Sequence, residues 1–491
     1  MKLYFFGHDY KYAAEQMLLT LFPEERPEYP EGKPEGERIE LSLVRRDEDL
    51  HAICTLVRNN SEWTGEDSCP IPIQSSELET DRLCQRILKN AMYRAALNSG
   101  LKKPEWGALT GVRPGKILCN LLRGGMTEST ALNSFISDYD VSPKRASLCM
   151  DTARVTLRTE SQLLPNDVCL YIGIPFCPTR CAYCSFVSQS VEKSMKLISP
   201  FLEALLKEVH ATAEQVNRLG LRPISVYMGG GTPTTLSANQ LNVLCSALER
   251  EFDLSQLREY TVEAGRPDTI TVDKLRVLKS HGVDRVSVNP QTMSDSVLET
   301  IGRKHTAADI VTALEKVREI GGFSVNMDLI AGLPSDTAES FRKTLETVLA
   351  LNPENITVHT LSLKKGSGIT MNGAALPTGD EVSRMLEFSF GRLAESGYSP
   401  YYLYRQKFMS GGFENIGWTK QGYDNLYNIC IMEELCSIIA MGGGGSTKLV
   451  APGDARNIRV MAPKYPQEYI QMIDRTCSEK QKIAQFYTRE E

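Results

Sequence analysis

Three cysteines with short, regular spacing are the residues of this sequence that most directly indicate chemistry. Cys177, Cys181 and Cys184 form a C-x3-C-x2-C pattern directly after an apolar, strand-like run, Cys169 to Ile174. Thiolates are soft, anionic ligands, and three of them on one short loop can hold three irons of a [4Fe–4S] cluster. The fourth iron is then open to another ligand. The pattern therefore predicts an open-valence iron–sulfur site.

An incomplete zinc site or a chance cluster is the alternative interpretation of these cysteines. Structural zinc takes four ligands, usually from two C-x2-C pairs or from one such pair and a pair of histidines. No matching second pair of either kind occurs in the sequence. The spacing therefore favours iron and sulfur over zinc.

The elements that must position this loop belong to a chain of ordinary globular composition. It has 491 residues, enough for two or three domains, with 42% hydrophobic and 24% charged residues. The net charge of −6 gives no general attraction to nucleic acid or to an anionic membrane. We therefore expect no nucleic-acid partner, and an anionic ligand requires a local basic patch.

The location of the protein is predicted from its N-terminus, its hydropathy and its cysteines. The first residues lack the basic and apolar regions of a signal peptide, and no apolar run approaches the roughly 20 residues that span a bilayer. Thirteen cysteines in a chain without a secretion signal indicate a reducing compartment. We expect a cytoplasmic protein with no membrane span.

Strand-like runs that alternate with helical patterns begin near residue 167. The six runs are Leu170 to Ile174, Ile224 to Met228, Tyr260 to Glu263, Arg285 to Val288, Ser324 to Ile330 and Ile356 to Leu361. Such β-then-α units imply parallel strands with right-handed crossovers. The predicted fold class is α/β, with a partial (β/α)6 TIM-like barrel over residues 161–375. An N-terminal α+β domain of unknown role (1–160) precedes it, and a mainly helical C-terminal region (376–491), expected to cover the substrate, follows.

Polar and glycine motifs stand at the ends of these strands, where a parallel barrel gathers its chemistry. The second run ends in Gly229–Pro233 (GGGTP), the third in Glu263 and the fourth shortly before Gln291, and the fifth carries Asp328. Glycines let a ligand approach the backbone, and the polar side chains suit ribose hydroxyls or an amine. Any one of them alone is equally well explained as an ordinary strand-end residue. Their gathering at one barrel mouth predicts a ligand site.

From Tyr171 to the C-terminal region the sequence resembles a known group of enzymes. The motifs YIGIPFCPTRCAYCSF, YMGGGTPT, TVEAGRPD, RVSVNPQT, IGRKH and NMDLIAGLP occur in this order. They resemble the radical S-adenosylmethionine (SAM) enzymes, and within them the oxygen-independent coproporphyrinogen III dehydrogenase (oxidase) family. The N-terminal extension and the loop WGALTGVRP resemble the longer, Gram-positive-type branch of that family.

The resemblance implies two cofactors, a [4Fe–4S] cluster and SAM, and assigns residues to both. The cluster ligands are expected to be Cys177, Cys181 and Cys184. The expected SAM-binding positions are Tyr171, Tyr183, Gly230, Gly231, Thr232, Glu263, Gln291, Arg303, Asp328 and, after the sixth strand, Ser362. Tyr171 is also the expected catalytic residue.

The resemblance further implies a redox reaction on a tetrapyrrole. A low-potential electron donor such as flavodoxin or ferredoxin is expected to reduce the cluster, and SAM then yields a 5′-deoxyadenosyl radical. This radical is expected to start the oxidative decarboxylation of two propionates of coproporphyrinogen III to vinyl groups, giving protoporphyrinogen IX. Candidate cations for this tetracarboxylate are Arg303, Lys364, Lys365, Arg405 and Lys407, although each is also explained as an ordinary surface charge.

Two residues depart from the family pattern. Gly173 stands where well-known members have histidine, and Phe186 stands where many have a further cysteine. Phe186 is also compatible with a haem-chaperone branch, whose usual His-Asn-x-x-Tyr-Trp motif is absent here, since no histidine follows His359. A haem chaperone and a radical SAM enzyme acting on another tetrapyrrole remain the alternatives.

We interpret Met441–Ser446 (MGGGGS) as a close backbone approach to cofactor or substrate instead of a flexible linker.

Overall fold

The chain folds into two compact units. The computed structural model describes residues 1–72, 76–184, 189–190, 194–362, 375–406, 412–451 and 457–488. The first unit contains Met1–Met150 and Arg405–Phe413, and the second contains Asp151–Tyr404 and Glu414–Glu491. The chain passes from one to the other inside α5 (Pro143–Glu160). The predicted barrel and most of the predicted C-terminal region therefore share one unit.

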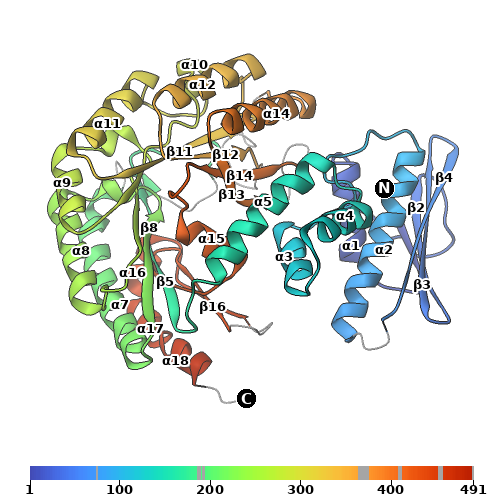
Figure 1. The fold of residues 1–491 in the computed structure, drawn as a ribbon, viewed down its shortest axis with the longest axis horizontal. Helices are drawn as coiled ribbons and strands as arrows, with labels where there is room; N and C mark the ends of the chain where they lie inside the picture. The colour runs from blue at the N-terminus through green and yellow to red at the C-terminus, as the bar shows by residue number, and fades with distance from the viewer. Residues whose placement is uncertain are drawn as a thin grey trace. The chain divides into compact units, whose positions relative to one another are not determined.

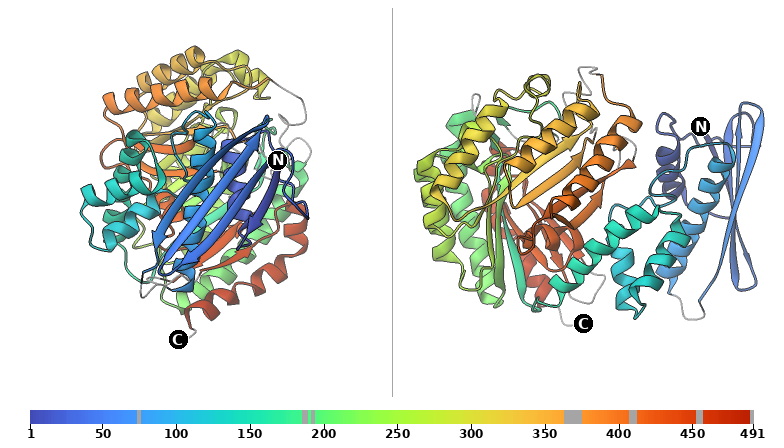
Figure 2. Two further views of the ribbon diagram at one scale, coloured as in Figure 1. Left: turned by 90° about the vertical axis from the view of Figure 1, so that its right-hand side faces the viewer. Right: turned by 45° about the horizontal axis from the view of Figure 1, so that its top comes forward.

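The first unit is built on a four-stranded sheet with the order β1-β2-β3-β4, seen face-on at the left of Figure 2. The strands are β1 (Lys2–Phe6), β2 (Arg38–Arg46), β3 (Asp49–Arg58) and β4 (Ser61–Pro70). The helices α1 (Lys11–Leu21) and α2 (Glu77–Asn98) bury residues such as Met17 and Ile87 in one core with this sheet. The helices α3 (Gly115–Arg123) and α4 (Glu128–Tyr139) complete the unit. An α+β texture for this part of the chain is what the sequence predicts.

Six parallel strands form the centre of the second unit. They are β5 (Asp167–Ile174), β8 (Arg222–Gly230), β9 (Glu259–Glu263), β10 (Arg285–Ser287), β11 (Ser324–Ala331) and β12 (Asn355–Thr360). They lie side by side in chain order, and each pair is parallel. Each strand coincides with one of the predicted runs. The predicted α/β fold with a partial (β/α)6 barrel is confirmed.

Helices cover the outer face of this curved sheet, as Figure 1 shows. They are α7 (Ile198–Arg218), α8 (Ala238–Glu251), α9 (Val272–Ser280), α10 (Asp295–Thr300), α11 (Ala307–Ile320) and α12 (Ala338–Ala350). α7 buries Phe201, Leu205 and Val209, the helical spacing that its sequence predicts. Capping boxes at Ser237 and Thr306 fix the first turns of α8 and α11, and so the loops that lead into them. None of the described helices is long and apolar enough to cross a bilayer.

The C-terminal region combines helices with strands that extend the barrel sheet. Its helices are α14 (Gly379–Glu395), α15 (Leu426–Glu433), α16 (Pro466–Gln471), α17 (Ile473–Ser478) and α18 (Gln481–Tyr487). Its strands are β13 (Ser399–Arg405), β14 (Glu414–Thr419), β15 (Ser437–Gly442), β16 (Ser446–Val450) and β17 (Asn457–Met461). β14 pairs antiparallel with β12, and β15 pairs parallel with β5. Both sides of the six-stranded centre are therefore extended by strands from the C-terminal part of the chain.

One apolar run in this region is divided between a helix and a strand. The apolar run from Ile431 to Ala440 has a helical pattern in sequence, but the helix ends at Glu433 and β15 follows from Ser437. A short apolar run does not distinguish a buried strand from a buried helix. Pairing with β5, which lies far away in the sequence, makes Ser437–Gly442 a strand.

Candidate active site

The cysteine loop begins beside the glycine turn that ends β8. The Gly231 N–H donates to the Ile174 carbonyl (2.8 Å), and the Thr232 N–H donates to the Phe176 carbonyl (2.7 Å). A Cβ atom on Gly231 would lie 2.4 Å from the Phe176 oxygen, so this approach requires glycine. Gly230 has a φ of 101°, which also favours glycine. The structure thus brings together two motifs that the sequence predicts to share a site.

Two side chains from the loops that follow β8 and β9 donate to the sulfurs of this loop. The Thr232 hydroxyl lies 3.5 Å from Cys177 Sγ, and Arg266 Nη1 lies 3.8 Å from Cys181 Sγ. Arg266 is only 3% exposed, and its guanidinium also binds Asp268 (3.1 Å) and the Thr179 hydroxyl (3.0 Å). Donors of this kind stabilise thiolates and tune a bound cluster. Arg266 lies within the TVEAGRPD motif, but the sequence interpretation missed its role.

The other side of the loop packs on α10 and the end of β11. The Ala182 N–H donates to the Ile301 carbonyl (3.0 Å). Ala182 and Tyr183 rest on an apolar cluster of buried residues: Val297, Leu298, Ile301, Ile330, Leu333 and Leu361. The loop is therefore anchored from both sides.

Tyr183 and Arg303, both predicted to contact SAM, bind each other. Arg303 Nη2 donates to the Tyr183 hydroxyl (2.9 Å), and Arg303 Nη1 donates to the Asn289 carbonyl (2.7 Å). Arg303 is 8% exposed, and its Nε has no hydrogen-bond partner in the described part of the chain. A buried donor without a partner costs free energy unless a ligand satisfies it.

The donor set fits a [4Fe–4S] cluster with one open iron. Three thiols lie on one anchored loop, with Cys181 buried and Cys177 and Cys184 partly exposed. Two of their sulfurs already accept hydrogen bonds, and a buried cation, Arg266, lies beside them. These are the ligands and outer contacts that such a cluster requires.

Two carboxyl groups, Glu263 on β9 and Asp328 on β11, have pKa values that are shifted in opposite directions. The Tyr227 hydroxyl donates to Glu263 Oε1 (2.6 Å). Burial raises the pKa of Glu263 to about 7, an effect that this hydrogen bond opposes and the charge of Asp328 reinforces. Burial alone would raise the pKa of Asp328, but His359 and a hydrogen bond from Asn326 (2.8 Å) lower it instead. Near neutral pH the pair thus combines a carboxylate with a carboxyl group that is half protonated.

Gln291 adopts an unusual backbone conformation beside Asp328. Its φ is 67°, in the left-handed region that non-glycine residues rarely occupy. Its N–H donates to the Asp328 carbonyl (2.9 Å), and its carbonyl accepts from the Ile330 N–H (3.0 Å). Such strain persists only where the surroundings hold it, and it is concentrated at ligand sites. Ser362 lies just after β12.

Tyr171, the predicted catalytic residue, belongs to a stack of three tyrosines. Its ring centroid lies 6.3 Å from that of Tyr227 and 6.1 Å from that of Tyr427, and the last two lie 4.4 Å apart. Burial raises the pKa of Tyr171, so its hydroxyl is protonated at neutral pH. Tyr427 comes from α15, and no local sequence signal connects it to the other two. A catalytic role for Tyr171 stays a prediction.

The turn Met441–Ser446 approaches β5 directly before the cysteine loop. A Cβ atom on Gly173 would lie 2.8 Å from the Gly443 carbonyl oxygen, and one on Gly443 would lie 2.7 Å from Pro175 Cγ. The turn therefore makes a close backbone approach to the end of β5. Contact with a cofactor or substrate stays a prediction. The same packing explains why glycine, without a side chain, stands at position 173.

One side chain predicted to bind the substrate, Arg405, is instead bound to other groups of the protein. Arg405 is 7% exposed and donates to the carbonyls of Leu109 and Gly412, and its guanidinium lies 5.0 Å from the centre of the Trp106 ring. It therefore holds the loop around Trp106 within the first unit, and the predicted role in substrate binding is not supported. Phe186, Lys364, Lys365 and Lys407 lie outside the described residues.

Comparisons with known proteins point to one group. The family description "Radical SAM superfamily" matches residues 171–348. The chain is 35% identical over 476 residues to "Oxygen-independent coproporphyrinogen-III oxidase-like protein HemZ" of Bacillus subtilis, a match that covers 95% of this chain and 94% of that one. It is 33% identical over 262 residues to "Heme chaperone HemW" of Bacillus subtilis, covering 52% of this chain and 67% of that one.

A solved structure supports the same fold. The similarity to coproporphyrinogen III oxidase (HemN) from Escherichia coli has a TM-score of 0.52 at 24% sequence identity. It covers 66% of this chain and 73% of that one. At this identity the likeness establishes the barrel architecture alone.

Proposed function

The chain belongs to the radical SAM superfamily, in its oxygen-independent coproporphyrinogen III oxidase-like family, and on that premise we propose its reaction. The proposed reaction is the oxidative decarboxylation of two propionates of coproporphyrinogen III to vinyl groups, giving protoporphyrinogen IX. The cofactors of this family are a [4Fe–4S] cluster and SAM, which together supply a 5′-deoxyadenosyl radical when bound. The cluster ligands we propose are Cys177, Cys181 and Cys184.

The observation that carries the proposal is the attachment of the cysteine loop to the glycine turn at the carboxyl ends of β5 and β8. Gly231 and Thr232 bind the backbone of the loop, and Thr232 and Arg266 donate to its sulfurs. In this arrangement the loop is held rigidly at the end of the barrel where parallel-barrel enzymes perform their chemistry.

The remaining predicted residues have roles that follow from their chemistry. The backbone of Gly230 and Gly231 offers polar groups to the amino-acid part of SAM. Glu263 and Asp328 suit its hydroxyl and amino groups, and the unpaired Nε of Arg303 is a donor for an acceptor on the ligand. The barrel positions these groups and excludes water from a reactive intermediate. The C-terminal region is proposed to cover the substrate.

The cellular setting is part of the proposal. None of the thirteen cysteines, all of which lie in the described part of the chain, forms a disulfide, which suits a reducing compartment such as the cytoplasm. A low-potential donor such as flavodoxin or ferredoxin would supply the electron there.

Haem binding and delivery is the alternative function, because relatives named heme chaperone HemW match 52% and 61% of the chain. The HemZ relative matches nearly all of it, including the parts outside the barrel. This extent favours the decarboxylation over the chaperone function. A radical SAM reaction on another tetrapyrrole would use the same cofactor site.

The test is an anaerobic assay of the reconstituted, reduced protein with SAM and coproporphyrinogen III. We expect release of CO2, formation of 5′-deoxyadenosine and accumulation of protoporphyrinogen IX. Cys181→Ser should lose iron and all three products, whereas Cys245→Ser, which changes a buried thiol on α8, should retain them. Stoichiometric haem binding without CO2 release would overturn the proposal.

A further inference from the structure

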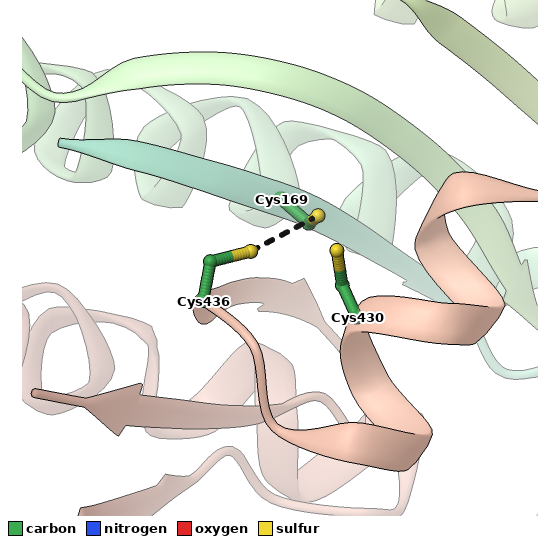
Figure 3. A group of neighbouring side chains, drawn as sticks. All are labelled: Cys169, Cys430 and Cys436. Carbon is green, nitrogen blue, oxygen red and sulfur yellow. Dashed lines mark hydrogen bonds between the residues drawn. The ribbon is translucent and has the colours of Figure 1, made fainter. Parts of the chain in front are cut away.

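Three further thiols meet inside the second unit, away from the cysteine loop (Figure 3). Cys169 lies on β5, Cys430 on α15, and Cys436 just before β15. Cys169 and Cys430 are fully buried, and Cys436 is 6% exposed. Their Sγ atoms all lie within 4.8 Å of one another, and those of Cys169 and Cys436 are 3.7 Å apart. Three separate elements of the fold thus bring their sulfurs to one point.

The spacing of these sulfurs matches that of thiolates that share one ion. Sulfurs bound to a single ion at about 2.3 Å lie roughly 3.8–4.0 Å from one another. The Cys169–Cys436 pair, at 3.7 Å, is close to this distance, and a small shift of Cys430 brings the third sulfur to it. In a [4Fe–4S] cluster each thiolate binds a different iron, so the sulfurs lie farther apart. The geometry therefore favours one ion over a second cluster.

The surroundings of the trio select a soft ion. The neighbouring side chains are mostly apolar and include Ile224, Ile438 and Tyr427. The nearest carboxylates are already paired: Asp167 binds Arg222 (2.9 Å), and Glu259 accepts from the Leu426 N–H (2.9 Å). Neither carboxylate is therefore available as a hard oxygen ligand. Thiolates without oxygen ligands prefer Cu(I) or Zn²⁺ to Mg²⁺, Ca²⁺ or Mn²⁺.

Ordinary burial explains a single cysteine better than it explains this trio. A free cysteine behaves as a small apolar residue and needs no sulfur neighbour. Cys245 is an example, since its thiol lies 3.5 Å from the Tyr260 hydroxyl. Three thiols that meet at the spacing expected for ligands of one ion form a more specific arrangement than a single buried cysteine.

We propose that Cys169, Cys430 and Cys436 form a binding site for a single thiophilic d10 ion, Cu(I) or Zn²⁺, separate from the iron–sulfur loop. The ion would cross-link β5 to α15 and to the start of β15. α15 also carries Tyr427, and β5 also carries Tyr171, so the ion would brace the tyrosine stack beside the candidate active site. This inference goes beyond the proposed reaction and does not depend on it.

The site is tested on the anaerobically reconstituted full chain. The protein is titrated with Cu(I) against a competing chelator, and separately with Zn²⁺, and metal and iron are counted in the same samples. We expect one tightly bound equivalent of one of the two ions in addition to the cluster irons. X-ray absorption should show three sulfur ligands at about 2.3 Å. The tighter of the two titrations identifies the better occupant, and the spectra should show a fourth, light ligand for Zn²⁺ and none for Cu(I).

Matched variants separate this site from others. Cys430→Ser and Cys436→Ser should lose the additional ion, Cys245→Ser should keep it, and Cys181→Ser should keep it while losing iron. The ion should also raise the melting temperature of the wild type and leave that of Cys430→Ser unchanged. Absence of a bound ion in the wild type, absorption spectra without sulfur ligands, or full retention by the Cys430→Ser/Cys436→Ser double variant would each overturn the proposal.

Discussion

Gly173 and Gly442 lie opposite each other in the parallel strands β5 and β15, and the backbone of one occupies the side-chain space of the other. A Cβ atom on Gly442 would lie 2.2 Å from the Gly173 carbonyl oxygen, and Gly442 has a φ of 91°. The cysteine loop begins only four positions after Gly173. The packing of two glycines therefore fixes the strand from which the loop starts.

A side chain at position 173 should weaken this packing. We expect Gly173→Ala to lower the free energy of unfolding by about 1–3 kcal/mol, because its Cβ meets the Gly443 carbonyl at 2.8 Å. Gly391→Ala is the control, since that glycine lies exposed in α14 with nothing near its Cβ, and alanine should stabilise it by roughly 0.5–1 kcal/mol. Denaturant unfolding measures both. A Gly173→Ala variant as stable as the wild type would refute the contact.

Glu208 on α7 should be essential for holding the same turn. It is fully buried and binds Lys480 Nζ (2.7 Å), the Gly442 N–H (2.7 Å) and the Tyr469 hydroxyl. We expect Glu208→Ala to cost about 3–5 kcal/mol, because it leaves Lys480 buried without its carboxylate. The exposed Glu214→Ala on the same helix should change stability by less than about 0.5 kcal/mol.

A double variant distinguishes lost charge pairing from lost packing at this site. Glu208→Leu combined with Lys480→Met removes both buried charges, so it should be more stable than Glu208→Leu alone, which leaves Lys480 buried without its carboxylate. Equal losses in the two proteins would show that the ion pair is not what stabilises the turn.

Arg266 should raise the reduction potential of the bound cluster. Its cation and its hydrogen bond to Cys181 stabilise the more negative, reduced state. Arg266→Gln should therefore lower the potential by on the order of 50 mV, the equivalent of about 1 kcal/mol for one electron. Redox titration followed by electron paramagnetic resonance measures the shift, with the exposed Arg250→Gln as control. An unchanged potential in protein of full iron content would contradict the assigned role.

Glu263 should make the stability of the protein depend on pH. Its pKa is raised from 4.5 to about 7 in the folded state, so the unfolded chain loses this proton first as pH rises. The group therefore lowers the free energy of unfolding progressively as the pH rises from about 4.5 to 7. The loss is at most about 3 kcal/mol, and the partial exposure of Glu263 makes it smaller. Glu263→Gln, whose amide oxygen still accepts from Tyr227, should remove this part of the slope in urea unfolding between pH 5 and pH 8. Parallel pH profiles for the two proteins would show that Glu263 titrates normally.

The sequence predicts the barrel and the pairing of its main motifs because both depend on local patterns. Strand-like runs such as Ile224 to Met228 alternate with amphipathic helices, and the parallel-barrel rule then places the cysteine loop and Gly230–Thr232 at the same end. Each of those strands and that neighbourhood appear in the structure. The family resemblance supplies the cofactors.

The features that the sequence does not reveal depend on contacts between distant segments. The pairing of β15 with β5, the stacking of Tyr427 on Tyr171, and the meeting of Cys169 with Cys436 all join residues more than 250 positions apart. In the sequence Cys436 looks like an ordinary buried thiol, and its two sulfur neighbours are visible only in the fold.

The most direct test of the central claim is the stoichiometry of the anaerobic reaction with coproporphyrinogen III. The proposed decarboxylation predicts two CO2 and two 5′-deoxyadenosine for each protoporphyrinogen IX, with all three products absent in Cys181→Ser. Intact SAM and no CO2 in a protein of full cluster content, together with one tightly bound haem per chain, would contradict it and identify a haem-binding protein instead.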